Sequence, residues 1–368
     1  MRAGRAKIDI TPAAGTPMDG YYVRSEPSIG VHDPLYCRAV VLDDGSKTLA
    51  IASCDLCWVT YPVVTEVRRQ AALVGIDHVF ISATHSHSGP AIADFLAPAT
   101  RAGSDYLRGL PGLIVSAIRE AYGNTEPCSL ALTRNSSRIS VNRRSATKET
   151  DPEVVSMMFE GSKGQPIAAM ADYGCHPTVL GPENLLISAD YPGCTSTMVE
   201  DHFGDGFVCV FLNGALGDVN PRTCRGYNCH GDFSDVLGVS TELSDSILHP
   251  TTEGPIEDTS GLRLASQVIG PLEPNGLRFE VEAMGLGDFV LLGVPAEVFA
   301  STGIWLKSRL KGANLMLTSC SNGYCGYIPA PDAFLRGDDE AKFVCWVDSD
   351  AESKLRTSCV TLVESVAK

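Results

Sequence analysis

Short apolar runs bounded by Gly, Asp or Pro recur along the chain and predict many short β-strands. The runs are rich in β-branched residues, which suit the pleated, half-buried surface of a sheet. We expect strands at Tyr36–Leu42, Thr48–Cys54, His78–Ala83, Ser129–Arg134, Val154–Phe159, Ile167–Tyr173, Phe207–Leu212, Leu277–Glu282 and Phe289–Val294.

Segments with helical spacing of apolar residues lie between these runs. Thr60 and Pro62 suit the start of a helix, and Gly123 suits the end of one that Pro111 interrupts. The last helix places Leu355 to Val366 on a core-facing stripe. We expect helices at 60–75, Ser104–Tyr122, Cys194–Phe203, Val236–Leu248, Glu297–Leu310 and 355–366.

The alternation of strands and helices predicts an α/β fold with layered mixed β-sheets and flanking helices. We find no linker that would split the chain, so we expect a single catalytic domain over residues 1–368. The stretch 222–275 is rich in Gly, Pro, Ser, Thr and acidic residues, which predicts a loop-rich insertion.

Composition narrows the class of protein. Hydrophobic residues make up 44% and charged residues 20%, a globular balance. The net charge of -15 repels phosphate backbones and argues against a nucleic-acid partner. The sequence has no apolar run of about 18 residues, so no membrane span is predicted. The N-terminus shows no secretory pattern, so a cytoplasmic location with reduced thiols is expected.

Several of the 13 cysteines stand in suggestive pairs. Cys54 and Cys57 are three apart in a predicted strand, where side chains point to opposite faces, so we expect no shared metal there. The pairs Cys224/Cys229 and Cys320/Cys325 lie in loop-like sequence. For each of these two loop pairs, the sequence leaves three alternatives open: a disulfide, an accessory metal, or neither.

A polar turn, Thr84-His85-Ser86-His87-Ser88-Gly89-Pro90, follows the strand predicted at 78–83. Two histidines two apart at a strand end can face the same side, and sites in α/β folds lie where strands feed loops. Neutral imidazole is the commonest metal ligand in proteins. Taken alone, the pair is at least as typical of two solvent-facing loop histidines.

Three other predicted strands or their loops also lead to candidate side chains. His176 lies in Cys175-His176-Pro177-Thr178, and Glu297 follows Gly293-Val294-Pro295-Ala296. A glycine-rich loop over 322–329 carries two tyrosines. Each also has an explanation without a functional site. The histidine could simply lie in a turn, the glutamate could stabilise a helix N-terminus, and the glycines and tyrosines could form a plain turn.

Two histidines, a glutamate and an open position would suit a catalytic zinc. Zinc lowers the pKa of water enough to make it a nucleophile near neutral pH and polarises a carbonyl, which is the chemistry of amide or ester hydrolysis. The sequence contains no Gly-x-Ser-x-Gly, no His-Glu-x-x-His and no Walker A loop. No motif therefore supports the common alternatives.

Taken together and in order, these motifs resemble the neutral/alkaline non-lysosomal ceramidase family. The resemblance extends from about residue 8 to residue 327 and rests on Ile8–Pro12, Met18–Tyr21, Thr84–Pro90, Asn142-Arg143, His176–Thr178, Ser188–Gly193, Asn213–Pro221, Gly293–Glu297 and Gly326-Tyr327.

The resemblance implies one zinc ion per chain, with His85, His176, Glu297 and Tyr327 as its ligands. It places His87 beside the metal as a proton-transfer or substrate-orienting group. It further implies that Arg143 holds the substrate carbonyl or a developing oxyanion. We also expect the carboxylate of Asp218 to accept an N–H from a ligand histidine.

Two departures from the family pattern bear on the substrate. The serine proposed as the family's nucleophile falls at Asn220, whose amide can hydrogen-bond the substrate but cannot attack it. We also expect the protein to lack the family's C-terminal β-sandwich domain. Both departures favour a smaller soluble amide over a membrane lipid.

We therefore expect a zinc-dependent amidohydrolase that acts on a small or medium N-acyl or cyclic amide. The alternatives are a true ceramidase, which releases sphingosine and fatty acid, an ester or lactone hydrolase, and a catalytically silent binding protein on the same scaffold. The expected partner is a small-molecule amide, and assembly into a homo-oligomer is left open.

Overall fold

The computed structural model describes the chain apart from residues 93–100, 145, 225–228, 257, 260 and 368. Within the described residues the larger sheet has nine strands, and β13 (Thr252–Pro255) joins it beside β6. The other eight follow the order β11 (Val208–Asn213), β9 (Pro166–Tyr173), β8 (Glu153–Gly161), β6 (Glu126–Ser136), β1 (Arg2–Asp9), β3 (Tyr36–Asp43), β4 (Thr48–Cys54) and β5 (His78–Ala83).

A second sheet lies against the first. Its strands, in order, are β14 (Arg263–Leu272), β15 (Leu277–Leu286), β16 (Phe289–Gly293) and β18 (Asn314–Thr318). Three short pairs complete the strands of the described residues: β2 (Gly30–Val31) with β10 (Leu186–Ile187), β7 (Ser140–Asn142) with β12 (Val219–Pro221), and β17 (Glu297–Val298) with β19 (Tyr327–Ile328).

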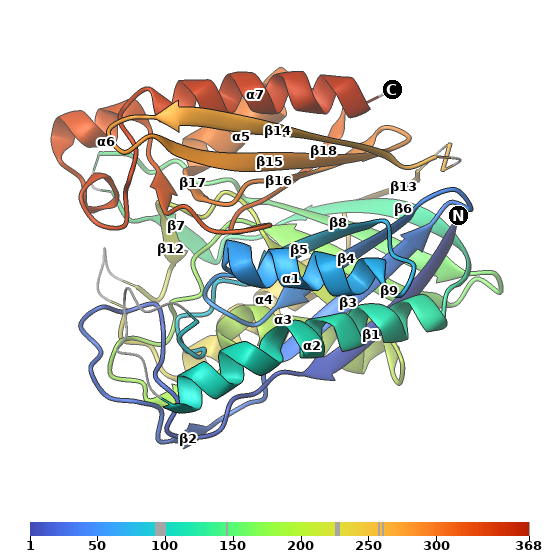
Figure 1. Ribbon diagram of the computed structural model, residues 1–368, viewed down its shortest axis with the longest axis horizontal. Coiled ribbons are helices and arrows are strands. Elements are labelled where there is room, and N and C mark those ends of the chain that lie inside the picture. Colours follow the sequence, from blue (N-terminus) through green and yellow to red (C-terminus); the bar gives the residue numbers. More distant parts are fainter. Residues whose placement is uncertain (93–100, 145, 225–228, 257, 260, 368) are drawn as a thin grey trace.

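The helices cover the outer faces of both sheets. Figure 1 shows α7 above the four-stranded sheet and α1 and α2 on the far side of the larger sheet. The molecule is thus layered as helices, small sheet, large sheet and helices. The bounds are α1 (Tyr61–Ala72), α2 (Arg101–Gly123), α3 (Asp190–Phe203), α4 (Phe233–Leu248), α5 (Ala300–Arg309), α6 (Pro331–Arg336), the 3-10 turn η1 (Asp339–Ala341) and α7 (Ala351–Val366). In the described part of the chain no helix has the length and apolar character of a membrane span.

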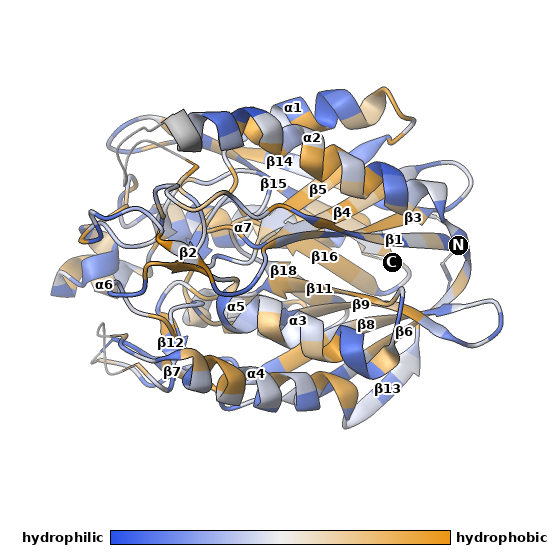
Figure 2. Ribbon diagram, turned by 90° about the horizontal axis from the view of Figure 1, so that it is seen from below, coloured by the Kyte–Doolittle hydropathy of each residue, from blue (hydrophilic) through white to orange (hydrophobic). Residues whose placement is uncertain are grey.

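Apolar side chains of the two sheets interlock in the middle layer. Buried Phe159 of the large sheet and Phe289 and Met316 of the small sheet belong to one core cluster. The strands at the centre of Figure 2 are mostly hydrophobic, as strands buried on both faces must be. A Cβ on Gly293 would lie 2.1 Å from Cζ of Phe80, so only glycine allows this approach between the sheets.

The layered α/β class and the strands expected from the sequence are confirmed, to within a few residues at each end. Two helix expectations are wrong. Glu297 does not begin a helix but lies in β17, and α5 starts at Ala300. Helix α2 runs through Pro111, because a proline removes one hydrogen bond while the flanking turns keep theirs. The stretch 222–275 carries regular structure in α4, β13 and β14.

Candidate metal centre

The candidate side chains lie just beyond the carboxyl ends of strands from both sheets. β5 is parallel to β4, β9 is parallel to β11, and β16 is parallel to β18. His85 follows β5 and His176 follows β9 in the large sheet, whereas β16 leads to Glu297 and β18 leads to Tyr327. The site therefore forms where the two sheets end together, as α/β topology favours.

Glu297 and Tyr327 are brought side by side by the short parallel pair β17–β19. The two residues are partners in its register, and the Glu297 amide donates to the Gly326 carbonyl at 3.0 Å. This explains why Glu297 lies in a strand. Its local sequence suits a helix start, but its backbone is bound to a segment thirty residues further along the chain.

Buried Asn213 joins the ends of three strands behind the histidines. Its side-chain Nδ2 donates to the carbonyls of Thr84 (2.9 Å) and Cys175 (3.0 Å), the residues directly before His85 and His176. Its Oδ1 accepts from the Cys175 amide at 3.2 Å, and its own carbonyl accepts from the Ser319 amide at 2.8 Å. A single amide side chain thus sets the relative position of both histidine loops.

The donor atoms converge closely. Oε2 of Glu297 lies 2.9 Å from Nε2 of His176 and 3.5 Å from Nε2 of His85. The Tyr327 hydroxyl lies 3.3 Å from Nε2 of His176. His85, His176 and Glu297 form one of two groups in the described residues that could hold a metal ion, and all three are at most 2% exposed.

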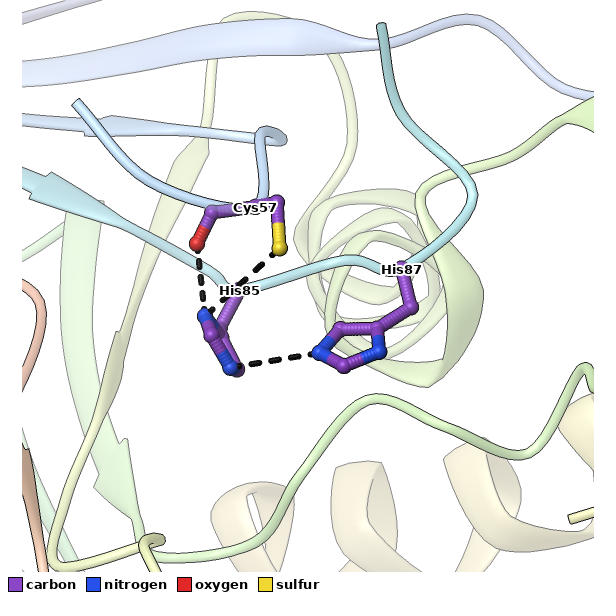
Figure 3. A group of neighbouring side chains, drawn as sticks. All are labelled: Cys57, His85 and His87. Atoms are coloured by element: carbon purple, nitrogen blue, oxygen red, sulfur yellow. Dashed lines mark hydrogen bonds between the residues drawn. The ribbon is translucent and has the colours of Figure 1, made fainter. Parts of the chain in front are cut away.

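Both ligand candidates among the histidines turn Nε2 toward this point because Nδ1 is held elsewhere. Nδ1 of His85 lies 2.6 Å from the Cys57 carbonyl (Figure 3), and Nδ1 of His176 lies 2.8 Å from the Leu216 carbonyl. A carbonyl only accepts hydrogen bonds, so each Nδ1 carries the proton and each Nε2 offers a lone pair. His85 keeps this orientation with a φ of 72°, which is uncommon for a residue other than glycine.

The described geometry fits a metal ion of zinc's size. Tetrahedral zinc with bonds of about 2.0–2.1 Å requires ligand atoms about 3.4 Å apart. The measured separations of 2.9, 3.3 and 3.5 Å are close to that spacing. Nitrogen and oxygen donors, with Nδ1 protons anchored behind them, are what such a site needs.

The charges around the site favour the metal-binding forms of His176 and Glu297. Burial lowers the pKa of His85, but the neighbouring Cys320 and Glu297 outweigh it and raise that pKa above its usual value, so a bound metal has to displace a proton there. Burial, followed by the nearby Arg143 guanidinium, lowers the pKa of His176 to about 4, so this imidazole is neutral. Burial raises the pKa of the Glu297 carboxyl, but His85 and His176 outweigh it and hold the pKa well below its usual value. Burial and the Glu297 charge raise the pKa of the Tyr327 phenol.

His87 lies at the same point rather than apart from it. Its Nε2 is 3.2 Å from Nε2 of His85 (Figure 3), and its buried Nδ1 has no hydrogen-bond partner among the described atoms. Gly20 packs so tightly on the ring that a Cβ there would lie 2.4 Å from Cγ of His87. Burial, then the neighbouring histidines, lower the pKa of His87, which keeps the ring neutral.

Arg143 and Asn220 border the donor cluster. The Arg143 guanidinium donates to the Tyr327 hydroxyl (3.1 Å) and to Oδ1 of Asn220 (3.1 Å). It also lies 3.5 Å from Nε2 of His176. The structure therefore brings together all seven site residues named from the sequence, His85, His87, Arg143, His176, Asn220, Glu297 and Tyr327.

One expectation for a neighbouring residue is wrong. The Asp218 carboxylate accepts from the Ala300 amide and the Asn142 side chain and does not meet a histidine. Backbone carbonyls of Leu216 and Val219, on either side of it, take the His176 proton instead. Asp218 thus fixes the loop that supplies these carbonyls.

Sequence reasoning missed Tyr324 as a site residue. Its hydroxyl donates to Oε1 of Glu297 at 2.5 Å, which leaves Oε2 facing the histidines. The sequence signal was present, because Tyr324 is three residues before Tyr327 in the same glycine-rich loop.

The cysteine pairs differ in state. Cys224 and Cys229 form a disulfide, whereas Cys320 and Cys325 are free thiols. Cys57 lies past the end of β4, and its sulfur is 3.9 Å from Nδ1 of His85 (Figure 3). With His85 and His87 it makes the second group that could hold a metal in the described residues.

Comparison with known proteins identifies the family to which the chain belongs. The model of the family described as neutral/alkaline non-lysosomal ceramidase, N-terminal, matches residues 1–273. The chain belongs to this family. Neutral ceramidase A of Dictyostelium discoideum is 29% identical over 261 residues, covering 61% of this chain and 36% of that protein. Neutral ceramidase of Pseudomonas aeruginosa is 26% identical over 247 residues, covering 60% and 37%.

The ceramidase fold extends beyond the part that the family model matches. The crystal structure of neutral ceramidase from Pseudomonas aeruginosa superposes with a TM-score of 0.82 at 17% identity, covering 100% of this chain and 75% of that one. A structure titled ceramidase complexed with C2 gives 0.84 at 17% identity, covering 100% and 76%. The chain spans about a third of the length of the curated relatives it matches. Glu297 and Tyr327 lie past residue 273, where the structural likeness supports the family fold.

Proposed function

We propose that the chain is a zinc-dependent hydrolase that cleaves the amide C–N bond of an N-acyl substrate. The observation that carries the proposal is the convergence of His85, His176, Glu297 and Tyr327 on one point, with donor separations that suit tetrahedral zinc. Membership in a family whose named relatives are ceramidases supports the same bond type.

Zinc bound here would supply a Lewis acid for the substrate carbonyl and lower the pKa of a water molecule. The chain's own residues supply the rest. Neutral His87, whose Nε2 lies beside the donors and whose Nδ1 has no hydrogen-bond partner among the described atoms, can accept the proton of the attacking water and pass it to the leaving amine. Arg143 can donate to the oxygen that becomes negative as the carbonyl is attacked.

The identity of residue 220 bears on whether the substrate carbonyl is attacked by a side chain or by water. Its Oδ1 accepts from Arg143, and its Nδ2 donates to the sulfur of Cys229 at 3.5 Å. An amide in this position cannot form a covalent acyl intermediate, so attack by water is the route that these residues support. Asn220 instead holds the guanidinium that faces the substrate.

Two substrate classes follow from different observations. The names of the relatives favour ceramide itself, which would make the chain a true ceramidase. Asn220 in place of a hydroxyl nucleophile favours a smaller N-acyl or cyclic amide. The reaction proposed is the same for both, and only the leaving amine and the acyl chain differ.

The test combines metal analysis with hydrolysis. Purified protein should contain about one zinc per chain, and His176→Ala should remove it, because two nitrogen donors and one carboxylate are the core of the site. Zinc-loaded protein is then incubated with ceramide and, separately, with a panel of short N-acyl amides, lactams and esters, and the released amine or acid is quantified.

The outcomes separate the hypotheses. Zinc-free protein whose behaviour is unaffected by His176→Ala contradicts the metal centre. Sphingosine release supports the ceramidase, and turnover of short amides alone supports the smaller substrate. Zinc-loaded protein that cleaves only esters or lactones overturns the amide assignment, and no turnover on any of them indicates a binding protein. Turnover abolished by Glu297→Gln rules out the binding protein.

A further inference from the structure

Arg143 is an unusual neighbour for a metal centre because it is a buried cation. Its guanidinium is within 3.5 Å of two candidate metal donors, the His176 ring and the Tyr327 hydroxyl. A positive charge at this distance opposes the binding of a divalent cation. Burying such a charge also costs free energy unless a carboxylate pairs with it.

The accompanying carboxylate is Glu340. Its Oε1 accepts from Nε of Arg143 at 2.7 Å, and the two side chains are 1% and 9% exposed. The remaining guanidinium nitrogens face the site side, where they meet Tyr327, Asn220 and the Gly217 carbonyl. Glu340 therefore holds the edge of the guanidinium that is turned away from the donors.

Glu340 belongs to a segment that touches the site at two places. This α6–η1 segment, residues 331–344, follows β19 directly. Its far end returns to the site, where the Val344 carbonyl accepts from the Tyr327 amide at 2.9 Å. A Cβ on Gly326 would lie 2.1 Å from that carbonyl, so the contact is close. One segment thus supports both Tyr327, through its backbone, and Arg143, through Glu340.

The same segment has a second anchor that does not reach the donors. Arg144, the next residue after Arg143, donates to Asp338 and Asp332, each at 2.7 Å. Two adjacent arginines are therefore paired with three carboxylates of one segment. Arg144 also lies 3.6 Å from Asp218, which supports the loop behind His176. Only the Glu340 pair contacts candidate donors through its arginine, so its role can be separated from anchoring of the segment.

We propose that Glu340 is a positioning residue: it fixes the Arg143 guanidinium against Tyr327 and Asn220 and offsets its charge beside the metal. The inference rests on the proposed function, because it concerns the same site. Among the described residues Glu340 contacts none of the candidate metal donors, and its link to the site runs through Arg143. Its loss removes the carboxylate that accepts from Nε of Arg143 and offsets the guanidinium charge, so the guanidinium is held less firmly where it meets the substrate oxygen.

Glu340→Gln is the first test, made on the zinc-reconstituted full chain. Zinc affinity of the apo-protein is measured by competition with a chromophoric chelator, and kcat and KM are measured on the amide identified above. We expect the zinc Kd to rise and kcat to fall, each by about tenfold or more, as seen when groups behind metal ligands are removed. KM should change little, because Glu340 makes no contact with substrate.

Two matched controls remove other acid–arginine pairs. Asp338→Asn removes from the α6–η1 segment one of the two carboxylates that accept from Arg144. Glu352→Gln breaks the half-buried pair of Glu352 with Arg356 on α7. Both should keep zinc affinity and kcat within about twofold of the wild type, since neither contacts Arg143. Thermal unfolding of all three variants checks that a shared loss of stability does not explain the result.

The Arg143→Gln background gives the decisive comparison. If Glu340 acts only through Arg143, adding Glu340→Gln to Arg143→Gln should not lower kcat further. It should also return the zinc Kd to within about threefold of the wild type, because one positive and one negative charge have been removed together. This double variant buries no unpaired charge, so it carries the test if Glu340→Gln alone does not fold.

Failure is readily identified. The proposal is overturned if Glu340→Gln matches the two controls, or if it lowers kcat as strongly in the Arg143→Gln background as in the wild type. A wild type that binds no zinc would instead contradict the proposed function. A wild type that binds zinc and cleaves amide, with Glu340→Gln unchanged, contradicts only this inference.

Discussion

The two candidate ligand histidines are oriented by backbone carbonyls rather than by acidic side chains. Cys57 supplies the carbonyl for His85, and Leu216 and Val219 supply those for His176. Any residue can present a carbonyl, so no residue type in the sequence marks these partners. That is why the sequence pointed to the Asp218 carboxylate when the adjacent backbone has the role.

The Tyr324 hydroxyl should tune the metal centre through Glu297. Tyr324→Phe removes the 2.5 Å hydrogen bond to Oε1 and lets the carboxylate rotate. We expect the zinc Kd to rise by about tenfold, within the range found for partners of metal ligands. Chelator competition measures this directly. The control is Tyr106→Phe on α2, which removes a phenol that donates to the Ile10 carbonyl and should leave the affinity unchanged.

Which side chains gather at the site was predictable where it depended on residue type. His85, His176, Glu297 and Tyr327 could be named as candidates because imidazole, carboxylate and phenol are metal donors and because these residues follow the order of the family's motifs. The role of Glu340 was not predictable, because nothing in its local sequence shows that it meets Arg143. That contact joins residues 197 apart in the chain.

At the scale of elements, the nine strands expected from apolar runs were found, whereas β1, β14, β18 and the two- and three-residue strands were missed. β4 and β9 are almost entirely buried, and their sequences are mostly apolar. β17 and β19 have two residues each and exist only because they pair with each other. β1 was missed because its Arg, Lys, Gly and Ala residues are poor strand formers, although β3 pairs along its full length.

Asn213 should control the strand ends on which the site is built. Asn213→Ala leaves the Thr84 and Cys175 carbonyls and the Cys175 amide without this partner in a buried environment. We expect the free energy of unfolding to fall by about 2–4 kcal/mol and zinc affinity to fall with it, since lost buried hydrogen bonds cost about 1–3 kcal/mol each. Urea unfolding and chelator competition measure the two effects.

A second asparagine provides the comparison for that change. Asn124 also bridges two elements, by bonding both backbone groups of Arg5, but it is exposed and far from the donors. Asn124→Ala should reduce stability only slightly and leave zinc affinity unchanged. Asn213→Ala with wild-type zinc affinity would show that the histidine loops hold their positions without it.

At the scale of the whole molecule, the donors come from distant parts of the chain and from both sheets. His85 and His176 extend the large sheet, whereas Glu297 and Tyr327 extend the small one. The hydroxyls of Ser82 on β5 and Thr318 on β18 lie 3.1 Å apart near the same ends, so the sheets already touch there. A metal at this point would bind both layers to each other.

This arrangement predicts that metal removal weakens the entire fold rather than one loop. A ligand bound only by the folded state adds about 2.7 kcal/mol of stability when its free concentration is a hundred times its Kd. Chelation should therefore lower the midpoint of thermal unfolding by several degrees, and added zinc should restore it. Scanning calorimetry with and without chelator measures the shift. Glu297→Gln should show little response to either addition, because its donor set is incomplete. A wild type with the same midpoint in both conditions would mean that the two sheets are not joined through a metal.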